Sequence, residues 1–170
     1  MARATHIASI MDLHKIVVAT DFSADAEAAL DLALELTRSS HADVFLVHVC
    51  HIPSYAFFNG GLFVPLPSLF TEIVEDAKMA LRAEQEKRAR SGSALSTVCL
   101  EGEPELEIVR WAEQNKADLI VMGTHGRRGL GRLLMGSVAE HVVRRATQPV
   151  LTVHAKTKES AQEPTIAGAA

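Results

Sequence analysis

The stretch LIVMGTHGRRGLGRLLMGS, residues 119–137, decides the fold of this chain. It opens with a short apolar run, residues 119–122, which predicts a buried strand. A loop follows that holds five of the ten glycines of the chain, and Ser137 at its end begins a predicted helix over 137–146. Glycine lets a backbone approach a ligand closely, and the free N–H groups at a helix start suit phosphate. The stretch therefore predicts a strand, an anion-binding loop and a helix in that order.

Short apolar runs and helical stripes alternate along the rest of the chain. Strands are predicted at 16–19, 44–49, 96–100, 119–122 and 149–154, and helices at 24–39, 69–90, from Pro104 onward and at 137–146. Ser23 is expected to cap the first helix, whose first turn holds Asp25, and Gly92 is expected to end the second. Residues 51–70 show no sustained period and are predicted to form a long loop. These strands are apolar without alternation, so both of their faces must be covered. The order predicts an α/β fold: a single doubly wound, five-stranded parallel sheet with helices on both faces. Ligands of such sheets bind beyond the carboxyl ends of the strands, here near Asp21, Cys50 and Gly123.

Length and composition narrow the class of protein. The 170 residues suit one domain at about 100–200 residues per domain. We expect a loose N-terminal extension over residues 1–11, with Met11 an alternative start to Met1, a domain over 12–155 and a disordered tail over 156–170. The net charge of -4 gives no basic field, so nucleic acid and an anionic membrane are not expected partners. Cys50 and Cys99 lie inside apolar runs, which indicates reduced, buried thiols and a cytoplasmic protein.

The glycine loop does not fit two common phosphate motifs. Gly131 and Gly136 have the spacing of a Walker A loop, but Ser137 stands where its lysine belongs. Gly129 and Gly131 begin a dinucleotide fingerprint whose third glycine is replaced by Leu134. The alternative without a ligand is a flexible connection whose glycines only permit tight turns.

A more specific match is Gly123-x2-Gly126-x9-Gly136-Ser137, which resembles the G-2x-G-9x-G-[S/T] motif of the nucleotide-binding universal stress proteins. Residues 15–23 and 149–153 resemble the first and last strands of that family, so the likeness covers about residues 12–154. It implies the strand order 3-2-1-4-5 and binding of ATP, or of AMP or ADP, with or without Mg²⁺. It also implies a homodimer paired through the last strand, Val150, Leu151, Thr152 and Val153.

The resemblance also gives individual residues a role toward the nucleotide. The positions that match the nucleotide-binding residues of the family are Ala19, Thr20 and Asp21 beside the adenine and ribose, Val49 on the base, Met122 and Gly123 at the ribose, Thr124, His125 and Gly126 in the phosphate loop, and Gly136, Ser137 and Val138 at the helix start. Arg127 either neutralises phosphate or is an ordinary solvated arginine. Asp21 either contacts ribose or Mg²⁺ or only caps the turn into the next helix.

Other clusters lead to no prediction of a metal site or of a catalytic residue. His48, Cys50 and His51 lack the paired ligand spacing of zinc sites. His125 has no serine or cysteine nucleophile with an orienting acid beside it. The favoured function is an adenine-nucleotide-binding sensor or regulator in the stress response, acting through its homodimer or a further protein partner. The alternatives are a slow ATPase or phosphotransfer enzyme on the same sheet, and a dimeric interaction module with a vestigial site.

Overall fold

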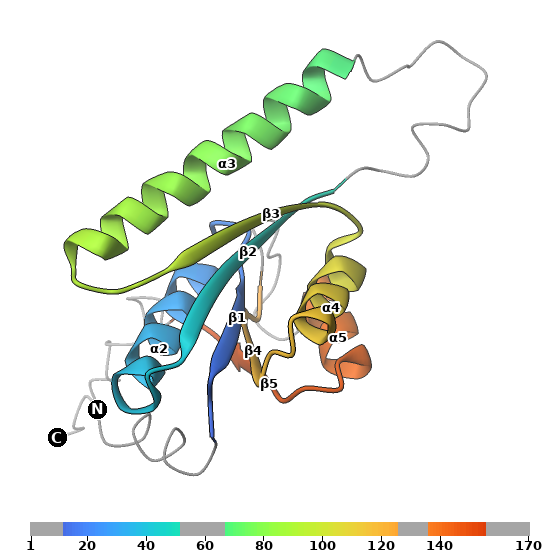
Figure 1. The fold of residues 1–170 in the computed structure, drawn as a ribbon. Coiled ribbons are helices and arrows are strands. Elements are labelled where there is room, and N and C mark those ends of the chain that lie inside the picture. Colours follow the sequence, from blue (N-terminus) through green and yellow to red (C-terminus); the bar gives the residue numbers. More distant parts are fainter. Residues whose placement is uncertain (1–11, 52–66, 126–135, 156–170) are drawn as a thin grey trace, which may run out of the picture.

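The computed structural model describes residues 12–51, 67–125 and 136–155, and within them a five-stranded parallel sheet forms the centre of the protein (Figure 1). The strands are β1 (Lys15–Ala19), β2 (Asp43–His51), β3 (Ser96–Gly102), β4 (Leu119–Gly123) and β5 (Val150–Val153). Their order across the sheet is β3-β2-β1-β4-β5, and every neighbouring pair is parallel. The predicted α/β class and strand order are confirmed.

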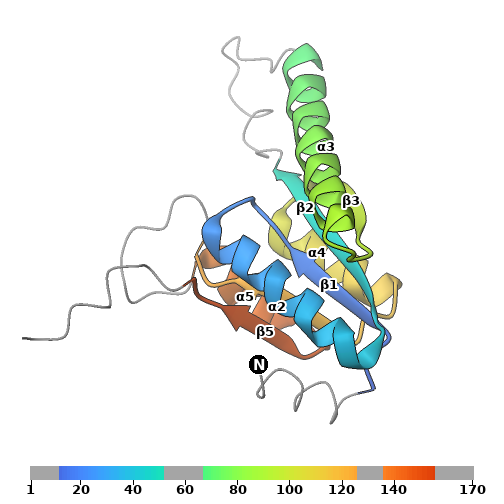
Figure 2. The same ribbon diagram turned by 90° about the vertical axis from the view of Figure 1, so that its left-hand side faces the viewer.

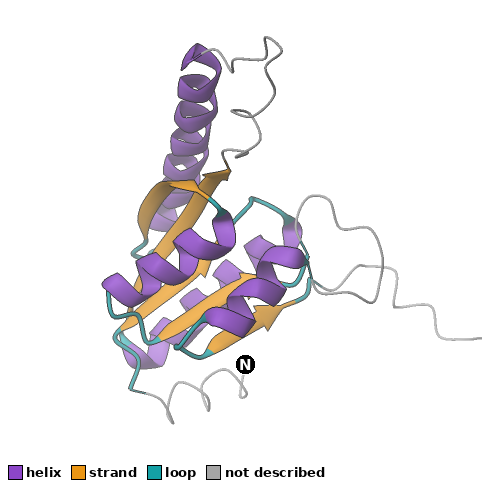
Figure 3. Ribbon diagram, turned by 90° about the vertical axis from the view of Figure 1, so that its right-hand side faces the viewer, coloured by secondary structure: helices purple, strands orange, loops and turns teal. Residues whose placement is uncertain are grey.

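Helices cover both faces of the sheet, as the apolar strands require. They are α2 (Ala24–Ser40), α3 (Pro67–Arg90), α4 (Pro104–Gln114) and α5 (Ser137–Arg145). Figure 2 shows α2 and α3 from one side, and Figure 3 shows α4 and α5 from the opposite side. Two buried clusters correspond to these layers: one joins α2 and α3 to the sheet through residues such as Leu30 and Leu81, and the other joins α4 and α5 through Ile108 and Val142.

Local sequence signals set several helix boundaries. Ser23 is the N-cap of α2, and its hydroxyl accepts a hydrogen bond from the N–H of Ala26 at 3.3 Å. Pro104 stands in the first turn of α4, where its missing N–H has no cost. Gly92, just past the end of α3, has a φ of +78°, a conformation that glycine adopts without strain. These three predicted signals are confirmed.

Some boundaries differ from the sequence prediction. β2 reaches His51 and β3 reaches Gly102, so both run two residues past the predicted apolar runs. α3 begins at Pro67, inside a stretch that was predicted to be a long loop over 51–70, because proline suits the first turn of a helix. The remainder of that loop, 52–66, and the predicted extension and tail lie outside the described residues. Among the described helices, none is long and apolar enough to cross a membrane.

Candidate functional site

The carboxyl ends of β1, β2 and β4 place three residues that are predicted to contact the nucleotide in one apolar cluster. Ala19, Val49 and Met122 belong to the buried cluster under α4 and α5, with exposed fractions of 7%, 8% and 4%. Ala19 pairs with Met122 across the β1–β4 ladder and with Val47 across β1–β2. The three therefore form an apolar floor at the carboxyl edge, of the kind on which a flat base packs.

The turn from β1 into α2 is closed by its own side chains. The Thr20 hydroxyl accepts from the N–H of Phe22 at 3.0 Å, and Asp21 Oδ1 accepts from the N–H of Ser23 at 3.1 Å. His48 Nδ1 lies 2.8 Å from the Thr20 carbonyl oxygen and donates to it from β2. The structure thus gives Asp21 the turn-capping role. Its contact with ribose or Mg²⁺ stays a prediction.

The start of α5 returns to the end of β4. Gly136 is the N-cap of α5, its N–H donates to the Thr124 carbonyl at 2.7 Å, and its carbonyl accepts from Glu140 at 2.9 Å. Within the described residues, no side-chain hydrogen bond caps the start of this helix. The N–H groups of Ser137 and Val138 in the first turn have no acceptor within the helix, so they can bind an anion. Gly126 and Arg127 lie outside the described residues, and their phosphate contacts stay predictions.

Two glycines of the motif act differently from one another. A Cβ at Gly123 would lie 2.8 Å from Asp25 Cβ and 2.9 Å from the Ala26 nitrogen, so the first turn of α2 packs on its bare backbone. Gly123 therefore has a packing role beside its predicted ribose contact. Gly136 has a φ of -59° and a ψ of 149°, which any residue adopts. Backbone strain therefore does not require glycine at position 136. The predicted reason for this glycine is that a side chain would occupy the space of a ligand.

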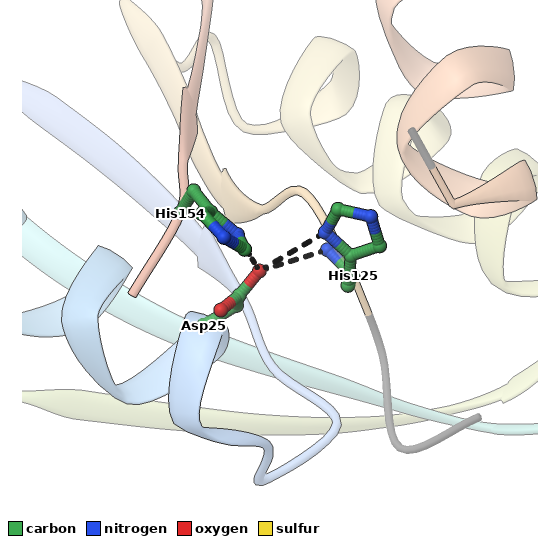
Figure 4. Close-up of side chains that lie close together, drawn as sticks. All are labelled: Asp25, His125 and His154. Atoms are coloured by element: carbon green, nitrogen blue, oxygen red, sulfur yellow. Dashed lines mark hydrogen bonds and ion pairs between the residues drawn. The ribbon is translucent and has the colours of Figure 1, made fainter. Parts of the chain in front are cut away.

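The buried carboxylate of Asp25 joins three segments of the chain (Figure 4). Asp25 Oδ2 accepts from the Thr124 hydroxyl at 2.9 Å and from the N–H of His125 at 3.1 Å, and His154 Nδ1 lies 3.0 Å away. Asp25 Oδ1 accepts from the N–H of Ala155 at 2.9 Å. Asp25 therefore fixes the first residues after β4 and after β5 against α2.

The charge of this carboxylate is stabilised by its donors. Burial raises the pKa of Asp25, but the hydrogen bonds from Ala155, His154, Thr124 and His125 together hold that pKa below its usual value of 3.8. Asp25 is thus ionised at neutral pH. Only 10% of its side chain is exposed, so solvent weakens these contacts little.

Sequence reasoning placed His125 in the loop but missed Asp25 and His154 as its partners. Asp25 was interpreted only as an acidic residue that suits the dipole of the helix, and His154 only as the end of a strand. The contact joins residues 129 apart in the chain. The contact between the two histidines could have been found from the expected neighbouring position of β4 and β5. Gly123 pairs with Val153, so the residues that follow the two strands lie close together.

The cysteines lie on neighbouring strands, with 3.7 Å between Cys50 Sγ and Cys99 Sγ. Cys50 is buried, but Cys99 is half-buried, so the prediction that both thiols are buried is wrong for Cys99. It lies on β3, at the edge of the sheet, where cover is incomplete. The pKa of the Cys50 thiol is raised to about 11. Burial is the largest cause, and the hydrogen bond with Cys99 is the next largest. Nδ1 of the neighbouring His51 lies 3.2 Å from Oε2 of Glu103.

Comparison with known proteins identifies the family. The family model described as the universal stress protein family matches residues 13–154. Universal stress protein MJ0531 of Methanocaldococcus jannaschii is 38% identical over 151 residues, which cover 85% of this chain and 84% of that protein. The chain belongs to the universal stress protein family. The resemblance seen in the glycine motif is thereby confirmed at the level of the family.

Solved universal stress protein structures share this fold. The structure of MJ0577 matches with a TM-score of 0.73 and 31% identity, over 86% of this chain and 99% of that one. A universal stress protein in complex with cAMP matches with a TM-score of 0.56 and 26% identity, over 85% of this chain and 98% of that one. One from Archaeoglobus fulgidus in complex with dAMP matches with a TM-score of 0.60 and 28% identity, over 84% of this chain and 99% of that one. Some structural neighbours of this universal stress protein thus bind adenine nucleotides.

Proposed function

We propose that this universal stress protein binds an adenine nucleotide, ATP in the first place, and acts as a homodimeric sensor or regulator in the stress response. The observation that carries the proposal is the meeting of two surfaces at the carboxyl edge of the sheet. One is the apolar floor of Ala19, Val49 and Met122, and the other is the start of α5 at Gly136, which no side chain of the described residues caps. A base and a phosphate group need this pair of surfaces.

The nucleotides bound by two structural neighbours support the proposal that the ligand contains adenine. The ligands cAMP and dAMP share an adenine, a pentose and a phosphate, and both are held by proteins with this fold. In this chain, the base would rest on the apolar floor and its phosphates would meet the N–H groups of Ser137 and Val138. Phosphates beyond the first would extend toward Gly126 and Arg127, and Mg²⁺ would accompany them as in other nucleotide sites. The two cysteines in apolar runs favour a cytoplasmic location.

The homodimer is proposed to form through β5. Val150, Leu151, Thr152 and Val153 are all partly exposed, and among the described strands β5 pairs with β4 alone. Ile120 donates to the Pro149 carbonyl and Thr124 donates to the Val153 carbonyl. Backbone groups change sides with each residue, so Leu151 faces β4 while Thr152 presents its N–H away from β4. A second copy would pair with that side around a two-fold axis.

The dimer is tested at Thr152. Replacing Thr152 with proline removes an N–H from the side away from β4, and Thr152→Val keeps it as the matched control. In sedimentation at micromolar concentration, the parent and Thr152→Val should be dimers and Thr152→Pro should dissociate. A monomeric parent, or a Thr152→Pro variant as dimeric as the parent, would exclude pairing through this strand.

The nucleotide is tested by two measurements on purified protein. Mass spectrometry of small molecules released on denaturation should find an adenine nucleotide. Calorimetric titration with adenosine, AMP and ATP should show that affinity increases with the number of phosphate groups on the ligand. Ser137→Ala should weaken the binding of ATP by about 10- to 150-fold, since a hydrogen bond to a charged group contributes about 1.5–3 kcal/mol. Equal affinity of adenosine and ATP would contradict a phosphate site at α5.

A further inference from the structure

A cluster of potential metal ligands lies beside the predicted phosphate loop, on the side of the sheet that α2 covers (Figure 4). Asp25 comes from the first turn of α2, His125 from the residues after β4, and His154 from the residue after β5. One ligand atom of each lies within 4.8 Å of the others. These residues were not singled out as a metal site by the sequence.

The distances suit a small four-coordinate ion. Asp25 Oδ2 lies 3.0 Å from His154 Nδ1 and 3.4 Å from His125 Nδ1. Ligand atoms about 2.0–2.2 Å from a tetrahedral zinc ion stand about 3.3–3.6 Å from one another. The Thr124 hydroxyl oxygen lies next to all three, 2.9 Å from Asp25 Oδ2, 3.0 Å from His125 Nδ1 and 3.1 Å from His154 Nδ1. A small outward movement of these atoms makes room for an ion between them.

The four atoms are crowded, and not every contact between them can be a hydrogen bond. These four atoms make five contacts of 3.4 Å or less. The Thr124 hydroxyl and each imidazole Nδ1 carry at most one proton, and the carboxylate carries none. Three protons cannot make five well-aligned hydrogen bonds. A cation between the four atoms would accept a lone pair from each of them at once.

The donor types select the class of ion. Two imidazole nitrogens and a carboxylate oxygen are ligands that Zn²⁺ prefers, whereas Mg²⁺ and Ca²⁺ prefer oxygen alone. The carboxylate is already oriented, because its other oxygen accepts from the N–H of Ala155. The His154 side chain is 62% exposed and offers a route from solvent.

We propose that Asp25, His125 and His154 bind a divalent transition-metal ion, Zn²⁺ in the first place, with Thr124 or a water molecule at the fourth position. The ion would join the first turn of α2, the start of the glycine loop and the residues after β5. The site does not include Ala19, Val49 or Gly136, but it shares His125 and Thr124 with the predicted phosphate loop.

The experiment uses untagged protein freed of metal with a chelator and titrated with Zn²⁺ alone, without nucleotide. His154→Gln removes an exposed ligand and should fold normally, which circular dichroism checks. The matched control is His14→Gln, because His14 is also exposed and lies 3.7 Å from the carboxylate of Asp12. The parent and His14→Gln should bind one Zn²⁺ per chain. His154→Gln should bind at least ~10-fold more weakly, because removing a ligand costs no less than removing its supporting contacts.

Two further measurements sharpen the result. Co²⁺ should give the intense visible bands of four-coordinate cobalt in the parent and not in His154→Gln, and Mg²⁺ should not compete with Zn²⁺. Equal Zn²⁺ affinity of the parent and His154→Gln would overturn the proposal, as would a parent that takes up no Zn²⁺ saturably. Since nucleotide is absent, either failure leaves the proposed nucleotide function untouched.

Discussion

Replacing Asp25 with asparagine should destabilise the folded protein by about 2–4 kcal/mol. The asparagine keeps one oxygen, and its best orientation directs that oxygen at Thr124, His125 and His154. Its amide group then faces the N–H of Ala155, which loses its acceptor at a cost of about 1–3 kcal/mol. In the remaining hydrogen bonds a neutral amide oxygen replaces the charged carboxylate oxygen as the acceptor, which adds about 1 kcal/mol to the loss of stability.

The assay is urea unfolding at pH 7 in the presence of a chelator, so that no metal contributes. Asp31→Asn is the matched control, because Asp31 is an exposed aspartate on the same helix that pairs with Arg88. An exposed ion pair contributes about 0–1 kcal/mol, so this variant should lose less than about 1 kcal/mol. The reasoning is refuted if Asp25→Asn and Asp31→Asn unfold with the same free energy.

The loss of stability in Asp25→Asn should also depend on pH. The pKa of Asp25 is lower in the folded protein than its usual value of 3.8, so its contribution to stability is present above that value and is lost as the pH falls through the folded pKa. The difference between the parent and Asp25→Asn should therefore shrink as the pH falls below about 4. His154→Gln, which keeps Asp25 but removes one of its partners, is the control in the same pH series. A difference that stays constant down to about pH 2 would contradict the ionised state of Asp25.

Two further predictions follow from the packing. Gly123→Ala should cost about 1–3 kcal/mol in urea unfolding, because the new methyl group would lie 2.8–2.9 Å from atoms of Asp25 and Ala26 that belong largely to the backbone; an unchanged free energy of unfolding would show that α2 can move. The Cys50 thiol, with a pKa of about 11, should react with iodoacetamide far more slowly at pH 8 than a free cysteine, and faster as the pH rises toward that value; peptide mapping by mass spectrometry measures this, and rapid labelling at pH 8 would contradict the burial of Cys50.

Much of the fold could be predicted because its signals are local. The apolar runs, the Ser23 cap, Pro104 and Gly92 act within a few residues, and the structure confirms them. The ends of β2 and β3 could not be predicted from the apolar runs, because residues such as His51 and Glu101 join the ladder through their backbone groups, whatever their side chains are. The strand order came from the family resemblance, since the crossovers depend on packing across the whole domain.

The candidate site was predictable only in part. The chain order placed Gly136 and Ser137 at a helix start, where the structure has them. It did not show that Gly123 packs on α2 or that Asp25 meets His154, because both contacts depend on how a helix crosses the sheet. The half-buried state of Cys99 likewise depends on its position on an edge strand.

The most direct test of the nucleotide site is calorimetric titration of ATP into the parent and into Gly136→Val. The backbone at Gly136 has ordinary dihedral angles for valine, so the variant should fold with an unchanged far-ultraviolet spectrum. Its side chain would fill the space at the start of α5 where phosphate is proposed to lie. The parent should bind ATP, and Gly136→Val should not. If Gly136→Val binds ATP as tightly as the parent, phosphate does not lie at this helix start.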